Sequence, residues 1–154
     1  MTSDTARARE LLETQDLTLA LCRGESCTVS HQRGVAPLLA LLEGGASWAG
    51  ACAADKVVGA GAAFLYRLLG VREVWAPVMS RRAVEVLRRG SINPIAERET
   101  EAIVNRAGDG LCPMELAVAG IDDPQEALEA IRQKLEALQR GSGANRTSSQ
   151  AKRD

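Results

Sequence analysis

A cysteine, two glycines and an abrupt helix start lie close together in residues 105–115. Pro113 suits the first position of a helix, because its missing N–H would have no partner there. Cys112 then falls at the N-cap and Glu115 at the third helical position, as in a capping box with a thiol replacing the usual hydroxyl. A helix N-terminus favours a thiolate. Cys112 is therefore a candidate nucleophile, with Glu115 or Asp55 transferring protons, and a buried structural cysteine is the alternative.

A second candidate site is the pair Asp55 and Lys56, which begins an apolar segment ending at Gly70. Asp55 is a suitable N-cap and Gly70 a suitable C′ residue, so the pattern predicts a buried helix over residues 55–70. A carboxylate and an ammonium at one helix N-terminus could face a polar ligand, and the helix end would favour a phosphate or carboxylate. The simpler interpretation is an ordinary N-cap beside a solvated lysine.

Further ligand-binding candidates are polar or glycine positions in two loops. Arg33 and Arg106 could hold the anionic group of a ligand, although surface arginines are usually only solvated. Asn105 and Gly110 belong to the same loop as Arg106 and could form one wall of a pocket. The glycine permits backbone angles that other residues avoid.

The elements that must position these residues follow from capping signals and hydrophobic periodicity. The predicted strands cover residues 17–22, 26–30, 49–53, 71–79 and 91–96, and the predicted helices cover residues 5–13, 37–43, 55–70, 81–89, 97–105 and 113–119, with a last helix that begins at Pro124. A hairpin followed by alternating helices and strands indicates a mixed sheet covered by helices. We therefore expect an α/β fold, a three-layer α/β/α sandwich with four to five strands.

One domain is expected over residues 1–140, followed by a polar tail over residues 141–154 that should be disordered. Within the predicted last helix, Leu128, Ile131, Leu135 and Leu138 lie on one face. Gly59 and Gly61 weaken the apolar helix, and close approach of its backbone to a neighbouring sheet would compensate. The four cysteines, Cys22, Cys27, Cys52 and Cys112, show no C-x-x-C spacing and are expected to be free thiols.

Three motifs stand out, namely Arg33-Gly34-Val35 before Pro37-Leu38-Leu39, Ala54-Asp55-Lys56-Val57-Val58-Gly59, and Asn105-Arg106 through Gly110-Leu111-Cys112-Pro113-Met114-Glu115. In this order they resemble a prokaryotic family known as domain of unknown function 1893. The start of the last helix, Asp122-Asp123-Pro124, is similar as well. The resemblance covers about residues 5–138. It implies a variant of the cytidine-deaminase fold and supplies positions rather than a reaction.

The zinc site of a deaminase needs His or Cys ligands at two helix starts, in an H-x-E…P-C-x-x-C pattern. This chain has Ala53-Ala54-Asp55-Lys56 at the first position and Pro77-Val78-Met79-Ser80 at the second. The single histidine, His31, lies far upstream. We therefore expect no metal. No cofactor is expected either, since Phe64 occupies the third glycine position of the dinucleotide-like segment at residues 57–64.

Composition excludes several classes of partner. The net charge is −1 and only 3% of residues are aromatic, so neither a basic surface nor a stacking platform for nucleic acid is expected. No apolar run is long enough to span a membrane. The charged first residues do not form a signal peptide, and a cytoplasmic location is expected.

Three functions remain open from the residues alone. The leading hypothesis is a metal-free, deaminase-like domain that binds a small anionic or nucleotide-like ligand between Asp55-Lys56 and the loop at residues 105–112. The second is an enzyme that uses Cys112 as its nucleophile. The third is a non-catalytic interaction domain that forms a homodimer.

Overall fold

The computed structural model describes residues 1–105, 107–108 and 110–153, leaving out the side chains of residues 142–153. Its described part contains six strands: β1 (Leu19–Arg23), β2 (Ser26–Ser30), β3 (Cys52–Asp55), β4 (Val57–Val58), β5 (Glu73–Ser80) and β6 (Asn93–Thr100). Its helices are α1 (Ser3–Thr14), α2 (Ala36–Glu43), α3 (Ala60–Leu69), α4 (Arg81–Arg89), α5 (Pro113–Ala117) and α6 (Pro124–Arg153).

The strands form one mixed sheet. β1 pairs antiparallel with both β2 and β3, whereas β5 pairs in parallel with β3, β4 and β6. Cys52 pairs with Glu73 and Val57 pairs with Val78, so the difference in residue number between paired residues is the same for β3 and for β4. The two short strands therefore form one line along β5 that is interrupted at Lys56.

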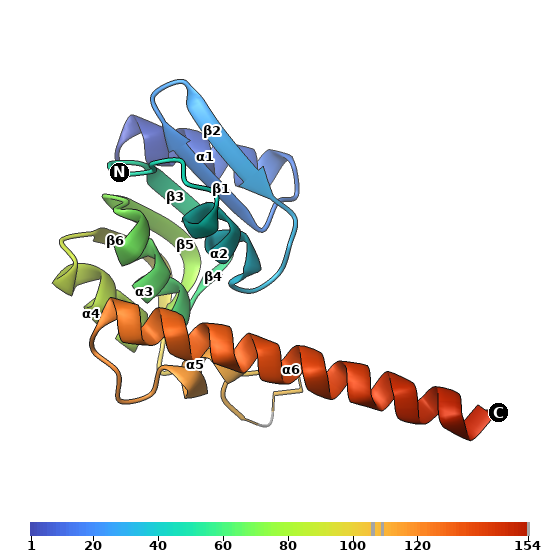
Figure 1. Cartoon of the computed structure of the whole chain (residues 1–154). Helices are drawn as coiled ribbons and strands as arrows, with labels where there is room; N and C mark the ends of the chain where they lie inside the picture. Colours follow the sequence, from blue (N-terminus) through green and yellow to red (C-terminus); the bar gives the residue numbers. More distant parts are fainter. Residues whose placement is uncertain (106, 109, 154) are drawn as a thin grey trace.

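Helices cover both faces of the sheet (Figure 1). On one face, Ala8 and Leu12 of α1 pack on Trp75 of β5. The other face carries the larger core, to which α2, α3, α4 and α6 contribute. The arrangement is the three-layer α/β/α sandwich predicted from the sequence. The sheet has six strands rather than four to five, because the segment around Asp55 contains two short strands.

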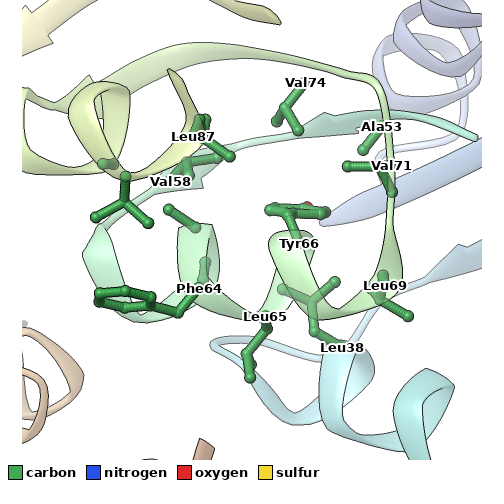
Figure 2. Packing of buried hydrophobic residues seen from close by; sticks show 14 of the residues in the cluster. Leu38, Ala53, Val58, Phe64, Leu65, Tyr66, Leu69, Val71, Val74 and Leu87 are labelled. Atoms are coloured by element: carbon green, nitrogen blue, oxygen red, sulfur yellow. The ribbon is translucent and has the colours of Figure 1, made fainter. Parts of the chain in front are cut away.

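The centre of the larger core lies between α3 and the sheet. Figure 2 shows Tyr66 of α3 beside Ala53 of the sheet, with Leu38 of α2 on the far side of the helix. Phe64, Leu65 and Tyr66 are almost completely buried. The apolar character of α3 on nearly all sides, which the sequence predicts, reflects this central position between layers.

Several local predictions are confirmed. The Ser80 side chain accepts a hydrogen bond from Ala83 N–H at the start of α4, and Gly70 ends α3 in the left-handed conformation with φ of 76°. The hairpin between β1 and β2 turns at Gly24, whose φ of 57° suits a two-residue loop. These features depend on short stretches of chain, and the sequence alone therefore identifies them.

Two predicted helices are wrong in whole or in part. The segment after Asp55 begins with β4 and becomes helical only at Ala60, so Asp55 ends a strand and is not an N-cap. The predicted helix at residues 97–105 is absent, because β6 continues to Thr100 alongside β5. Parallel pairing with a central strand overrides the local propensity in this segment.

The prediction of four free thiols is also wrong. Cys22 and Cys27 form a disulfide across the hairpin, where the two residues are directly opposed and their Cα atoms are 4.2 Å apart. Cys52 and Cys112 are free. The pairing depends on the register of two strands, which the cysteine spacing alone does not reveal.

The last helix begins as predicted, because the Asp123 carboxylate accepts a hydrogen bond from Glu126 N–H at 3.0 Å. Leu128 and Ile131 are buried, whereas Leu138 is exposed. The side chains of residues 142–153 and all of residue 154 lie outside the described part, and the disordered tail from residue 141 stays a prediction. Among the described residues, no helix combines the length and apolarity needed to cross a membrane.

Candidate functional site

A cavity of about 450 Å³ lies at the junction between the end of β3 and the start of α3. The carboxyl ends of sheet strands are common places for ligands in α/β folds. Apolar side chains from several elements form most of its wall, namely Leu19, Val35, Leu38, Ala62, Ile103 and Met114. Polar and charged groups are few and are grouped at particular points of the wall.

Asp55 lies at the point where the β3–β4 line is interrupted, with its side chain on the α3 face of the sheet. The Tyr66 hydroxyl donates a hydrogen bond to Asp55 Oδ2 at 2.6 Å, and Val57 N–H donates to Oδ1 at 3.4 Å. Burial raises the pKa of Asp55 to about 6, although these hydrogen bonds act in the opposite direction. The carboxyl can therefore gain or lose a proton near neutral pH.

Tyr66 is a member of the site that the sequence analysis did not identify. It is fully buried, and burial together with the neighbouring Asp55 raises the pKa of Tyr66 well above its ordinary value. Its hydroxyl therefore keeps its proton and acts as the donor to Asp55. A signal existed in the sequence, because a buried tyrosine hydroxyl on an apolar helix needs a polar partner.

Glu115 binds the start of α3 rather than the start of its own helix. Its Oε1 accepts a hydrogen bond from Ala60 N–H at 2.5 Å, across 55 positions of the chain. Cys112 is the N-cap of α5 as predicted, but its N–H donates to Ile103 O at 2.9 Å and its thiol makes no capping bond. The predicted capping box is therefore wrong, since Glu115 instead satisfies an amide of another helix.

Glycines at the start of α3 make this arrangement possible. A Cβ atom at Gly59 would clash with Glu115 Oε1, and a Cβ atom at Gly61 would lie 3.3 Å from Met114 Cβ. The predicted close approach to a sheet is wrong, because these glycines lie against residues of α5 instead. Burial raises the pKa of Glu115, whereas Ala60 N–H and the charge of Arg82 act to lower it.

Two exposed cations, Arg33 and Lys56, lie at the rim of the cavity. Lys56 Nζ is 3.4 Å from Asp16 Oδ1, a contact between two solvent-exposed side chains. Arg33 has no hydrogen bond or ion pair to any residue that the structure describes. The cavity is thus lined by two exposed cations and by two less exposed carboxyl groups, those of Asp55 and Glu115.

The remaining predicted residues divide into two groups. Cys112 is partly exposed and lines the cavity, so the cavity contains all three predicted catalytic residues. Asn105 and Gly110 lie outside the lining and shape the loop instead, since Asn105 N–H donates to Gly110 O at 2.8 Å. Arg106 lies outside the described residues.

Within the described residues, no three His, Cys, Asp or Glu side chains form a group suited to a metal ion. The starts of α3 and α4 carry Gly59-Ala60 and Ser80-Arg81, respectively. Neither start supplies the imidazole or thiolate ligands that a zinc deaminase uses.

Comparison with family models identifies the family. The model of the domain of unknown function DUF1893 matches residues 7–135. A crystal structure of a DUF1893 family protein from Thermotoga maritima is 24% identical in sequence and has a TM-score of 0.79. That similarity covers 87% of this chain and 92% of the other, and at this identity it shows a shared fold. A search of curated proteins gave no match. The chain belongs to the DUF1893 family.

Proposed function

We propose that the protein binds a small molecule in the cavity between β3 and α3, and that this ligand is nucleotide-like. The observation that carries the proposal is one cavity that combines an apolar wall, two inner carboxyls and two cations at its rim. Ligand sites are commonly concave and mostly apolar, with a few polar groups that fix orientation. The volume of about 450 Å³ is that of a small-molecule site.

The inner carboxyls favour a ligand that donates hydrogen bonds. Asp55 Oδ2 accepts from Tyr66, and Oδ1 is 3.4 Å from Val57 N–H, with the Lys56 backbone N–H also acting on the carboxylate. Each carboxylate oxygen has two lone pairs, so acceptor capacity remains toward the cavity. Glu115 is already bonded to Ala60 N–H and fixes the cavity wall. An amino or ring N–H group near Asp55 would meet this unused capacity.

The cationic rim favours an anionic group at the other end of the ligand. Arg33 offers a planar guanidinium that suits bidentate bonds to phosphate or carboxylate. Lys56, which also lines the cavity, supplies a second positive charge. The N-terminus of α3 is less available than the sequence suggests, because Glu115 already accepts the hydrogen bond of its first amide.

Thermal-shift measurements with nucleoside 5′-monophosphates, the matching nucleosides and inorganic phosphate would test the proposal. We expect the monophosphates to raise Tm most, since they can reach both Asp55 and Arg33. Arg33→Ala should abolish the advantage of a monophosphate over its nucleoside. Asp55→Asn should reduce the shift from both compounds.

Arg72→Ala is a matched control, because Arg72 is exposed and does not line the cavity. It should leave every shift unchanged. If no compound raises Tm, or if Arg33→Ala and Arg72→Ala respond alike, the proposed site is wrong.

A metal-free enzyme with Cys112 as nucleophile is the second candidate. It is favoured by the presence of Cys112, Asp55 and Glu115 in one cavity. Alkylation by iodoacetamide, followed by peptide mapping over a range of pH, tests it. Rapid labelling of Cys112 at neutral pH that Asp55→Asn slows would support catalysis, whereas labelling only near the pH of an ordinary thiol would contradict it.

We also propose that this fold is a variant of the cytidine-deaminase fold. The order of a β-hairpin followed by β3, α3, β5, α4 and β6 supports it. Superposition of the sheet and α3 on a cytidine deaminase would test this relationship. A different strand order in the superposed sheets would contradict it.

A further inference from the structure

Three of the four cysteines occupy one row across the sheet. Cys22 of β1 is directly opposed to Cys27 of β2 on one side and to Cys52 of β3 on the other. Cys22 and Cys27 form the disulfide, whereas Cys52 is a free, buried thiol. Directly opposed residues of neighbouring strands share a face of the sheet, so the free thiol lies beside the disulfide.

The spacing of the row suits a bond between Cys22 and either neighbour. The Cα distance of 4.2 Å between Cys22 and Cys27 is that of a non-hydrogen-bonded pair. Lys56 N–H donates to Thr18 O, so these two opposed residues form a hydrogen-bonded pair. Hydrogen-bonded and non-hydrogen-bonded pairs alternate along β1 and β3, and Cys22 and Cys52 therefore also form a hydrogen-bonded pair. Such pairs have Cα atoms about 5.5 Å apart, which is within the range of disulfides.

We propose that this row is an intramolecular thiol–disulfide exchange site. The Cys52 thiolate attacks Cys22 Sγ, the Cys22–Cys27 bond breaks, and Cys27 leaves as a thiolate. On balance the proton lost by Cys52 ends on the sulfur of Cys27, one disulfide replaces another, and no net oxidation takes place. The attacking sulfur approaches along the row, opposite the leaving sulfur, as thiol–disulfide exchange requires.

The consequence of the exchange is a change in which sulfur is accessible. Cys22 and Cys52 are completely buried, whereas Cys27 is exposed on β2. β2 is at the edge of the sheet, since β1 is the strand that pairs with it. The exchange therefore replaces a buried thiol with a surface thiol. That thiol can attack a low-molecular-weight disulfide and form a mixed disulfide, releasing the other half as a thiolate.

Three polar side chains, Thr2, Glu73 and Arg7, flank the row. Cys52 Sγ is 3.2 Å from Thr2 Oγ1, and the exchange requires the thiol to give up this contact as the sulfur turns toward Cys22. The next residue in the row is Glu73, whose carboxylate is held by Thr2 N–H and other donors. At the other end, the guanidinium of Arg7 donates to Gly24 O in the turn that the disulfide closes. A cation thus lies close to the turn from which the Cys27 thiolate would emerge.

Alkylation of the native, unreduced full chain with iodoacetamide, followed by non-reducing peptide mapping, tests the proposal. In the unmodified protein we expect Cys27 to become labelled with time while a Cys22–Cys52 peptide accumulates. Cys52→Ser should slow the labelling of Cys27 about ten-fold or more, because the internal attacking thiol is gone. Cys112→Ser, the other free cysteine, is the matched control and should leave the rate unchanged.

A second variant keeps the test decisive if Cys52→Ser does not fold. Cys27→Ser removes the Cys22–Cys27 disulfide at an exposed position and leaves Cys22 as a thiol. Oxidised glutathione should then oxidise Cys22 and Cys52 to a disulfide, with release of two molecules of glutathione. Circular dichroism would establish that each variant keeps its fold. Equal labelling of Cys27 with and without Cys52, or a Cys27→Ser protein that forms no Cys22–Cys52 peptide, would overturn the exchange.

Discussion

Two carboxylates on opposite faces of one sheet respond differently to burial. Burial acts to raise the pKa of Glu73 on the α1 face, but hydrogen bonds outweigh it and hold the pKa at about 2. The donors include Thr2 N–H at 2.7 Å and Asn93 Nδ2 at 2.8 Å. On the α3 face, burial raises the pKa of Asp55 to about 6, against weaker support from hydrogen bonds.

The difference shows that a structural carboxylate can be distinguished from a candidate functional one by the hydrogen-bond donors that surround it. Glu73 ties the N-terminal segment to two strands, and its oxygens are occupied by protein donors. Asp55 borders a cavity and retains acceptor capacity toward it. Substitutions that neutralise each carboxylate should therefore change stability in opposite directions.

We expect the largest loss of stability when Glu115, the second carboxylate that lines the cavity, is displaced. In Gly59→Ala the new Cβ would clash with Glu115 Oε1 and displace it from Ala60 N–H. We expect the free energy of unfolding to fall by about 3 kcal/mol, from the clash and the lost hydrogen bond together. Urea denaturation followed by circular dichroism measures this change.

Gly110→Ala is the control for that measurement. Its Cβ would meet only Asn105 Nδ2 at 3.6 Å, an ordinary van der Waals contact. A similar loss in both variants would mean that the contact between Glu115 and α3 does not limit stability.

Glu73→Gln should lower the free energy of unfolding by about 2 kcal/mol at pH 7, because hydrogen bonds to the charged form are lost. The folded-state pKa is depressed, so this stabilisation is present above the unfolded-state pKa and is lost as pH falls. We expect the loss in the unmodified protein between about pH 5 and pH 2. Denaturation across this range should give a flatter profile for the variant, and identical profiles would contradict the assignment.

Asp55→Asn should act in the opposite direction and raise the free energy of unfolding by about 1–2 kcal/mol at pH 8. The folded-state pKa of about 6 is raised, so the protonated form stabilises the fold and this benefit declines as pH rises. In the unmodified protein the decline should fall between about pH 4 and pH 6. Denaturation of the variant and of the unmodified protein at pH 4 and pH 8 measures this difference in stability. A variant that is less stable at pH 8 would show that Asp55 is also mainly structural.

The smallest effect should follow Lys56→Ala. Its contact with Asp16 joins two exposed side chains at 3.4 Å, so its loss should change the free energy of unfolding by less than about 0.5 kcal/mol. The variant should nevertheless weaken binding of a monophosphate in the thermal-shift assay. A large loss of stability with no change in binding would remove Lys56 from the proposed site.

Much of the candidate site could be predicted from the sequence. The cavity is lined by five of the predicted residues, namely Arg33, Asp55, Lys56, Cys112 and Glu115. They were identified as polar groups in or beside loops on an apolar scaffold, and such groups gather at the ends of sheet strands in α/β folds. Tyr66 was missed because its role depends on the partner that its hydroxyl meets.

The local features of the fold and its three-layer class can be read from short stretches of the sequence. Ser80 caps α4, Gly70 ends α3 and Asp123 begins α6, because each signal acts over a few neighbouring residues. The alternation of helix and strand patterns then leaves few architectures that bury every apolar face.

Which polar groups meet depends instead on how distant segments pack in the folded chain. The partner of Glu115 is an amide 55 positions away, and the partner of Asp55 is a tyrosine on the next helix. The disulfide between Cys22 and Cys27, with Cys52 beside it, depends on strand register. The free energy of these contacts depends on packing between distant segments, and local propensity carries no information about that packing.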